Sequence, residues 1–159
     1  MISIIDDDAF VRESLRDLID SLGHDVTTFE SAERFLEAAC LVETSCLITD
    51  LQMPGLSGLD LQGGLIADGH CIPIIFVTGL AAENFRVRAM SAGAVGFLSK
   101  PLDERLLISC LETALSPSQT RSYSYSRPRS RSSRRMDSGI AAAPLATRPK
   151  SRGASLAAK

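Results

Sequence analysis

The chain has 159 residues, of which 45% are hydrophobic and 23% are charged, and this length suits one domain of ordinary size plus an appendage. The longest apolar-rich stretch, around residues 72–82, is too short for the roughly 18 apolar residues of a membrane span, and the N-terminus does not have the pattern of a signal peptide. We therefore expect a cytoplasmic, non-membrane protein whose four cysteines are reduced and mostly buried, since they show no CxxC pairing.

The net charge of −2 hides two different segments. Residues 1–115 hold 18 Asp and Glu against 7 Lys and Arg, a net charge of −11, whereas residues 116–159 hold 10 Lys and Arg against Asp137 alone, a net charge of +9. The second segment is rich in Ser, Arg, Ala and Pro and has no sustained hydrophobic periodicity, so we expect it to be disordered. We predict a domain over 1–115 and a basic tail over 116–159, in which nothing could position sequence-specific contacts to nucleic acid.

Strand and helix patterns alternate from the start of the acidic segment. A β-branched run at 1–5 predicts the first strand. Apolar residues at helical spacing then predict a helix that ends before a glycine, with Phe10, Val11, Leu15, Leu18, Ile19 and Leu22 on its apolar face. A second strand at 26–29 is followed by a helix with Ser31 as its N-cap and with Phe35 and Leu36 on its buried side.

The rest of the acidic segment continues this alternation. In chain order we expect a strand at 46–49, a helix at 56–66, a strand at 73–77, a helix at 82–92, a strand at 95–98 and a helix at 103–115. The run at 73–77 shows no polar alternation, which predicts a central strand. One face of the last helix carries Leu106, Leu107, Cys110, Leu111 and Leu115.

Five strands alternating with five helices predict an α/β fold, a doubly wound parallel sheet with helices on both faces. In such folds each crossover is right-handed, and ligands bind outside the carboxyl ends of the strands. The residues at those ends are therefore the candidates for chemistry.

The predicted strand ends supply carboxylates, one hydroxyl and one ammonium group, from Asp6, Asp7, Asp8, Asp50, Thr78 and Lys100. Three carboxylates within about 4 Å repel each other by roughly 1–4 kcal/mol per pair, and a hard divalent cation such as Mg²⁺ removes that penalty. One carboxylate near the metal could attack phosphorus and become an acyl phosphate. The lysine and the threonine could then stabilise the phosphoryl oxygens.

Four separated blocks of sequence resemble the response-regulator receiver domain of two-component systems, and their wording is most similar to the FixJ-type subfamily. They read Ile-Ile-Asp-Asp-Asp at 4–8, Leu-Ile-Thr-Asp-Leu-Gln-Met-Pro-Gly-Leu-Ser-Gly at 47–58, Ile-Phe-Val-Thr-Gly at 75–79 and Gly-Ala-Val-Gly-Phe-Leu-Ser-Lys-Pro at 93–101. The resemblance covers residues 1 to about 115. It implies a flavodoxin-like sheet of five strands in the order 2-1-3-4-5, with five helices.

The resemblance also implies a metal site and a phosphoacceptor. Asp50 would take the phosphoryl group, and Mg²⁺ would be held by Asp6, Asp7, Asp50 and the backbone carbonyl of Gln52. Of the acidic pair, Asp7 would coordinate directly and Asp6 partly through water. Asp8 is expected to be a neighbour and not a ligand.

Three further roles follow from the resemblance. Thr78 would be a switch hydroxyl that moves toward the phosphoryl group, Phe97 an aromatic side chain that changes rotamer with it, and Lys100 the partner of the phosphoryl oxygens. The bond between Lys100 and Pro101 is expected to be cis. The protein would be a phosphoacceptor switch that assists its own phosphorylation and dephosphorylation and not an enzyme. Its partners would be a sensor histidine kinase and, through the face formed by the fourth helix, fifth strand and fifth helix, a second copy of itself.

Two alternatives differ from a stand-alone receiver. The subfamily usually continues into a helix-turn-helix domain, so the chain could instead be the remnant of a DNA-binding regulator whose output domain is lost by truncation or frameshift. An aspartyl phosphatase of the haloacid-dehalogenase type is disfavoured, because it needs a second Asp where this chain has Gln52.

Overall fold

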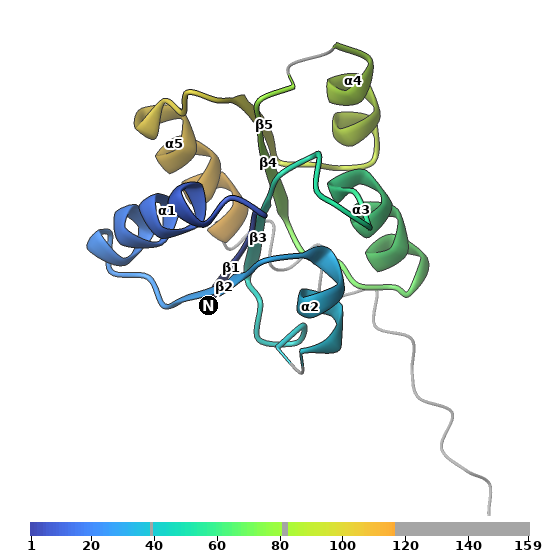
Figure 1. The fold of residues 1–159 in the computed structure, drawn as a ribbon, viewed down its shortest axis with the longest axis horizontal. Helices are drawn as coiled ribbons and strands as arrows, with labels where there is room; N and C mark the ends of the chain where they lie inside the picture. Colours follow the sequence, from blue (N-terminus) through green and yellow to red (C-terminus); the bar gives the residue numbers. More distant parts are fainter. Residues whose placement is uncertain (39, 81–82, 117–159) are drawn as a thin grey trace, which may run out of the picture. The chain divides into compact units, whose positions relative to one another are not determined.

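The computed structural model describes residues 1–38, 40–80 and 83–116. Strands and helices alternate through this part of the chain (Figure 1). The strands are β1 (Ile2–Ile5), β2 (Val26–Phe29), β3 (Cys46–Thr49), β4 (Ile74–Thr78) and β5 (Gly96–Ser99). The helices are α1 (Ala9–Ser21), α2 (Ala32–Glu37), α3 (Gly58–Ala67), α4 (Glu83–Ser91) and α5 (Glu104–Leu115).

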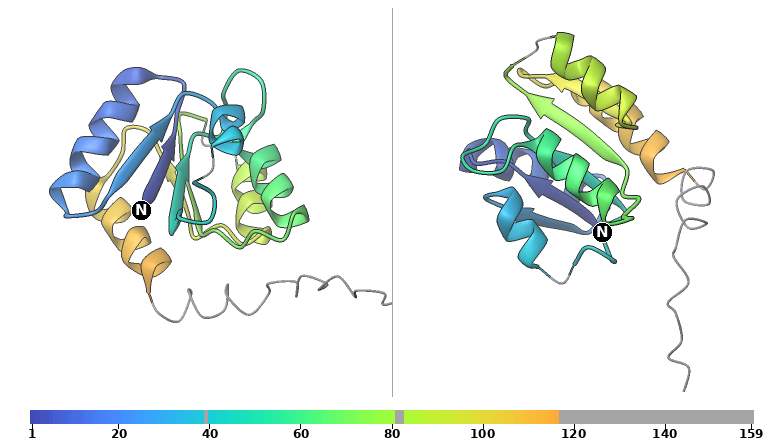
Figure 2. Two further views of the ribbon diagram at one scale, coloured as in Figure 1. Left: turned by 90° about the horizontal axis from the view of Figure 1, so that it is seen from below. Right: turned by 90° about the vertical axis from the view of Figure 1, so that its right-hand side faces the viewer.

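The five strands form one parallel sheet in the order β2-β1-β3-β4-β5, which the resemblance to the receiver domain implied. All residues of β1, β3 and β4 are buried, with the single-letter sequences ISII, CLIT and IIFVT. Helices α1 and α5 cover one face of this sheet, and α2, α3 and α4 cover the other (Figures 1 and 2). Both faces of the sheet are therefore buried, and its carboxyl edge is left for a site.

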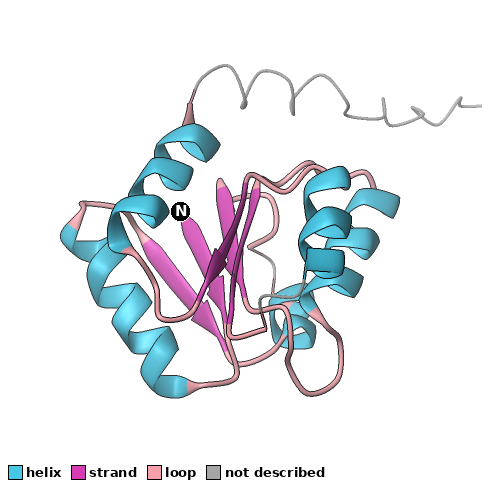
Figure 3. Cartoon of the chain, turned by 90° about the horizontal axis from the view of Figure 1, so that it is seen from above, coloured by secondary structure: helices cyan, strands magenta, loops and turns pink. Residues whose placement is uncertain are grey.

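Helices lie on both sides of the sheet (Figure 3), and each face of the sheet has its own hydrophobic core. Under α2, α3 and α4, the fully buried rings of Phe35 and Phe76 pack with Leu61 and Leu65. Under α1 and α5, the core is built from aliphatic side chains, among them Ile2, Ile4, Ile19, Ile48, Ile75 and Leu107. Alternate residues of one strand serve opposite cores, since Ile5 belongs to the first and Ile4 to the second.

The predicted elements all form, with boundaries that shift by up to two residues. The strands at 26–29 and 46–49 have the predicted bounds, and Ser31 caps α2 by accepting a hydrogen bond from the backbone N–H of Arg34. The helix expected from residue 56 begins at Gly58, because Ser57 is its N-cap and Gly55 adopts a φ of +83° in the turn before it. The expected tail over 116–159 lies outside the described residues beyond its first residue and stays a prediction.

The burial prediction for Leu36 was wrong, because this side chain is 40% exposed. Leu106 and Phe10, which were placed on apolar helix faces, are 55% and 86% exposed. Helical spacing alone therefore overestimated the extent of the buried faces of these helices. All four cysteines are free thiols, but only Cys46 is fully buried. No helix in the described ranges has both the length and the hydrophobicity that crossing a bilayer requires.

Candidate functional site

The carboxyl edge of the sheet carries an acidic cluster. Asp6 follows β1, and Asp50 follows β3, which pairs with β1 in parallel register. One carboxylate oxygen from each of Asp6, Asp7 and Asp50 lies within 4.8 Å of the other two. Asp6 and Asp50 are buried, whereas Asp7 is exposed, so the cluster opens to solvent on one side. The topology thus brings together three of the residues that the sequence predicted as metal ligands.

Lys100 reaches into this cluster from the end of β5. Its Nζ donates hydrogen bonds to Oδ2 of Asp6, at 2.8 Å, and to Oδ2 of Asp50, at 2.7 Å. The Lys100 side chain is 24% exposed, while that of Asp6 is only 1% exposed. The peptide bond between Lys100 and Pro101 is cis, as expected. The ammonium group of Lys100 therefore bridges two buried carboxylates, in the way that a bound metal cation bridges carboxylates.

Burial and charge pull the ionisation of these groups in opposite directions. Burial raises the pKa of Asp6, and this outweighs the hydrogen bond from Lys100, which lowers it. Partial burial lowers the pKa of Lys100, but the hydrogen bonds and negative charges of Asp50 and Asp6 together outweigh it, so the net pKa is raised. Lys100 is consequently charged at neutral pH, and it is the cation that offsets the carboxylates.

Backbone and cap contacts hold the loops that carry the carboxylates. The backbone N–H of Asp8 donates to Oδ1 of Asp6 at 2.9 Å, and the carboxylate of Asp8 itself caps α1 by accepting from the backbone N–H of Phe10. Asp8 therefore acts as a helix cap outside the cluster, in agreement with the expectation that it is a neighbour. The N–H of Gln52 donates to Oδ1 of Asp50 at 3.1 Å, which fixes the second oxygen of that carboxylate.

Sequence reasoning missed Arg12. From α1 its Nη1 donates to the backbone carbonyl of Asp6 at 2.6 Å, and so ties the helix to the loop after β1. The available signal was its position six residues after Asp6, where an arginine in the first turns of α1 can reach back over the loop. Sequence reasoning also missed Glu33, whose carboxylate accepts a hydrogen bond from the backbone N–H of Leu56 in the loop after β3.

The two expected switch residues lie on neighbouring strands. Thr78 ends β4 and is buried, and its Oγ1 accepts a hydrogen bond from the backbone N–H of Leu80 at 3.1 Å. Phe97 on β5 is half-buried, and its ring centroid lies 6.0 Å from that of Phe76. The backbone N–H of Lys100, the residue after β5, donates to the carbonyl oxygen of Thr78, the last residue of β4. This hydrogen bond links the ends of the two strands.

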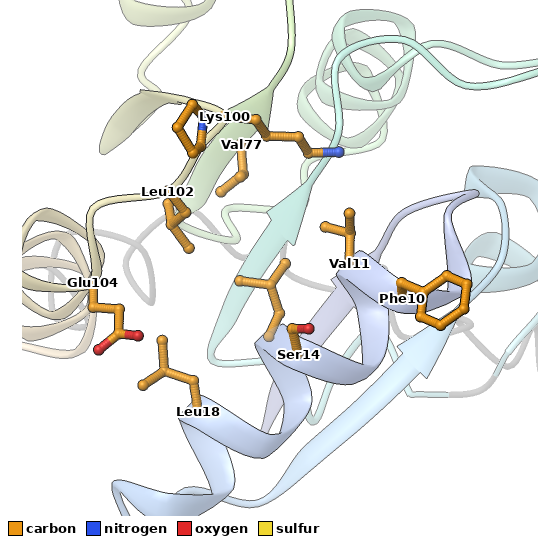
Figure 4. A pocket seen from close by; sticks show the side chains of 10 residues that line it. Phe10, Val11, Ser14, Leu18, Val77, Lys100, Leu102 and Glu104 are labelled. Atoms are coloured by element: carbon orange, nitrogen blue, oxygen red, sulfur yellow. The ribbon is translucent and has the colours of Figure 1, made fainter.

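A mostly apolar pocket of about 350 Å³ adjoins Lys100 (Figure 4). It lies between α1 and the segment that connects β5 to α5, and its lining comprises Phe10, Val11, Ser14, Leu15, Leu18, Val77, Lys100, Pro101, Leu102 and Glu104. The acidic cluster thus has an apolar concave surface on one flank.

Residues 2–112 match the family model of the response regulator receiver domain. The chain belongs to this family. The receiver domain is the part that it shares with solved structures: it superposes on the response regulator StyR with a TM-score of 0.71 and 41% identity, covering 78% of this chain and 63% of that one. The structure described as FixJ-N gives a TM-score of 0.65 and 37% identity, covering 72% of this chain and 91% of that one.

Similar curated proteins are longer than the receiver domain. The transcriptional regulatory protein FixJ of Bradyrhizobium diazoefficiens is 40% identical over 114 residues, which cover 72% of this chain and 56% of that protein. The response regulator protein TmoT of Ectopseudomonas mendocina is 43% identical over 115 residues, covering 72% of this chain and 52% of that protein. The chain thus spans about half the length of the curated relatives it matches, and the shared half is the receiver.

Proposed function

We propose that this receiver domain accepts a phosphoryl group on Asp50, from a phosphohistidine of a sensor histidine kinase, and that the modification switches its binding to a partner. The observation that carries the proposal is the bridge from Lys100 to Asp6 and Asp50 at the open carboxyl edge of the sheet. A carboxylate held between an acidic pair and a lysine is a nucleophile with charge compensation already in place.

The acidic cluster fits Mg²⁺. Its donors are all oxygens, from Asp6, Asp7 and Asp50, and they already lie within 4.8 Å of one another. Two oxygens bound to one Mg²⁺ at about 2.1 Å lie at most about 4.2 Å apart, so little movement is required to form the site. The carbonyl of Gln52 would add a fourth protein ligand. The ion would offset the charge of the carboxylates and of the incoming phosphoryl oxygens.

In the proposed reaction, a carboxylate oxygen of Asp50 attacks the phosphorus of the donor phosphohistidine. The new O–P bond forms as the P–N bond breaks, and the electron pair of the broken bond stays on the imidazole nitrogen. Lys100 would leave Asp50 and pair with the phosphoryl oxygens, because the carboxylate of Asp50 loses its negative charge when one of its oxygens is bonded to phosphorus. The hydroxyl of Thr78 would give up the N–H of Leu80 and donate to the same phosphoryl group.

The two flanks of the site would serve two partners. The pocket between α1 and the segment after β5 would receive the kinase, since Phe10 stands exposed beside it and close in sequence to Asp7. Movement of Thr78 would open space for a different rotamer of Phe97, and this would change the surface formed by α4, β5 and α5. Val87 and Leu106 are exposed apolar residues of α4 and α5, as a surface for a second copy of the domain requires.

The decisive experiment is phosphorylation by acetyl phosphate, a small donor that needs no kinase. We expect the intact mass of the wild-type chain to rise by one phosphoryl group in the presence of Mg²⁺, and not after chelation with EDTA. Asp50→Asn should gain nothing, and Asp60→Asn, an exposed carboxylate on α3, should behave as the wild type. Mass gain in Asp50→Asn equal to that of the wild type would refute the assignment of Asp50.

A second candidate is that this receiver controls a DNA-binding output domain. The observation in its favour is that the relatives it matches are about twice as long as the shared region, and that one of them is named a transcriptional regulatory protein. Translating the other two reading frames downstream of the Leu115 codon tests the frameshift version. A helix-turn-helix pattern there would support it, and its absence in both frames would count against it.

A further inference from the structure

We propose that Glu33 is a positioning residue of the phosphorylation site, and that it sets the Mg²⁺ affinity by holding the loop between β3 and α3 through the backbone N–H of Leu56. This inference rests on the proposed function, since it concerns the loop that would supply the carbonyl of Gln52 to the metal. Glu33 lies in the first turn of α2, far in sequence from any residue of the acidic cluster.

The contact between Glu33 and the loop is short and specific. The backbone N–H of Leu56 donates to Oε1 of Glu33 at 2.7 Å, across 23 positions of sequence. Hydrogen bonding to its own backbone N–H and then to that of Leu56 lowers the pKa of Glu33. The carboxylate is therefore ionised at neutral pH, so this is a charge-assisted hydrogen bond.

The turn before Leu56 has the shape that this contact needs. Gly55 adopts a φ of +83°, and a Cβ at this position would lie 2.5 Å from Oε1 of Glu33. Another residue would be strained at this φ, and its Cβ would displace the Glu33 carboxylate from its present position. The Glu33 carboxylate therefore contacts the backbone of the loop directly, at a position that has no side chain.

The remaining hydrogen bonds of the loop are local. The N–H of Gln52 donates to Asp50 at the start of the loop, and the N–H of Gly58 donates to the carbonyl of Leu51 at its end. Among the described residues, Glu33 supplies the hydrogen bond that ties residues 51–56 to an element other than β3 and α3, which adjoin the loop. Without it the outer half of the loop would be held by side-chain packing alone.

The position of the Gln52 carbonyl depends on this loop. If the loop lost its order, Mg²⁺ would have to order it again on binding, and this would make the free energy of binding less favourable. Glu33 is itself exposed, so the same contact adds little to the stability of the whole domain. A positioning role therefore predicts a separation of two quantities: Mg²⁺ affinity falls, while the unfolding midpoint stays nearly constant.

Three substitutions of Glu33 separate reach from charge. Glu33→Gln keeps an acceptor oxygen at the same reach and loses the charge, Glu33→Asp keeps the charge and shortens the reach, and Glu33→Ala loses both. The matched control is Glu37→Ala, which removes an exposed carboxylate from the same helix, where it contacts Arg34 and not the loop. Mg²⁺ binding to the unphosphorylated full-length chain is measured by isothermal titration calorimetry, because the chain has no tryptophan to report it.

We expect the Mg²⁺ dissociation constant of Glu33→Ala and Glu33→Asp to rise by about three- to tenfold, with a smaller rise for Glu33→Gln and none for Glu37→Ala. Amide hydrogen exchange of Leu56 should quicken in the same order, also without metal. A dissociation constant for Glu33→Asp equal to that of the wild type would overturn the proposal even if Glu33→Ala does not fold. In that case Mg²⁺ binding by the wild type would leave the proposed function standing, whereas a wild type that binds no Mg²⁺ would overturn both.

Discussion

The ammonium nitrogen of Lys100 lies 2.7 Å from Oδ2 of Asp50, although 50 residues separate them in sequence. The charge of this lysine compensates the almost fully buried carboxylate of Asp50. It contacts the same carboxylate that the proposed metal ion or phosphoryl group would contact. The same contact therefore links the stability of the metal-free domain to the chemistry of the site.

Lys100→Met retains the aliphatic stem and removes the charge. In the absence of metal we expect the variant to lose about 1–3 kcal/mol of unfolding free energy, because two buried carboxylates lose their donor. Mg²⁺ should restore more stability to the variant than it adds to the wild type, since the ion takes over the compensation. Urea unfolding with and without Mg²⁺ measures both effects. Arg105→Met, an exposed cation on α5, is the control, and equal Mg²⁺ effects in all three proteins would contradict the prediction.

Gly58→Ala tests the packing of α3 against Asp50. A Cβ at this position would overlap the carbonyl oxygen of Asp50 and would lie 3.0 Å from a ring carbon of Phe76, so the helix start would have to move. We expect a loss of about 2–4 kcal/mol in urea unfolding, in the range of severe packing clashes.

The matched control for Gly58→Ala is Gly63→Ala in the same helix. Nothing lies within 4 Å of a Cβ built there, so this substitution should stabilise the domain by about 0.5–1 kcal/mol through helix propensity. Opposite signs for the two variants are the expected result. Destabilisation of equal size would indicate that any side chain harms this helix, whatever its surroundings.

Phe10→Ala tests the proposed kinase surface. The ring is 86% exposed and lines the pocket beside Lys100, so its removal should weaken docking without altering the core. With a purified histidine kinase that phosphorylates the wild type, we expect the transfer rate to fall by about tenfold, as for loss of an aromatic contact of roughly 1.4 kcal/mol. Labelling by acetyl phosphate is the reference rate. An equal fall in both rates would place Phe10 in the chemistry and not in docking.

The pH dependence of stability reports the buried thiol of Cys46. Burial, with a smaller contribution from Cys110, raises the pKa of Cys46 to about 12 from 9.0. Above pH 9 the unfolded chain therefore releases a proton that the folded chain keeps, and stability falls as pH rises toward 12, by at most about 1.4 kcal/mol per pH unit. Urea unfolding at pH 8 and pH 10 should show a steeper loss for the wild type than for Cys46→Ala. Parallel losses in the two proteins would refute the role of this thiol.

The strands and their parallel sheet could be predicted from the sequence because the strand patterns are unambiguous, whereas the order of the strands was implied by the resemblance to the receiver family. The run at 74–78 is apolar apart from its terminal threonine, and a buried central strand is the structure that such a run favours. Because the carboxyl ends of parallel strands share an edge, the assembly of Asp6, Asp50 and Lys100 followed from the topology. The direct contact of Lys100 with both carboxylates was not predicted, because the expected partners of its ammonium group were phosphoryl oxygens.

Contacts set by side-chain reach were beyond the sequence. The hydrogen bond from Leu56 to Glu33 depends on how α2 is placed over the loop after β3, and no periodic pattern encodes that distance. The exposure of Phe10 was missed for a similar reason, since helical spacing gives the direction of a side chain but not where the neighbouring layer ends. The partner of Arg12 is the backbone carbonyl of Asp6. Every residue has such a carbonyl, so the type of the partner residue does not indicate the contact.

The bridge from Lys100 to Asp6 joins positions 94 residues apart. Four of the five strands, β2 to β5, lie between them, so Asp6 and Lys100 meet only after the sheet has assembled from β1 to β5. A nascent chain that ends before residue 100 has Asp50 but lacks its lysine. The proposed modification of Asp50 would then be restricted to molecules whose fold is complete, and incomplete chains would be excluded from signalling.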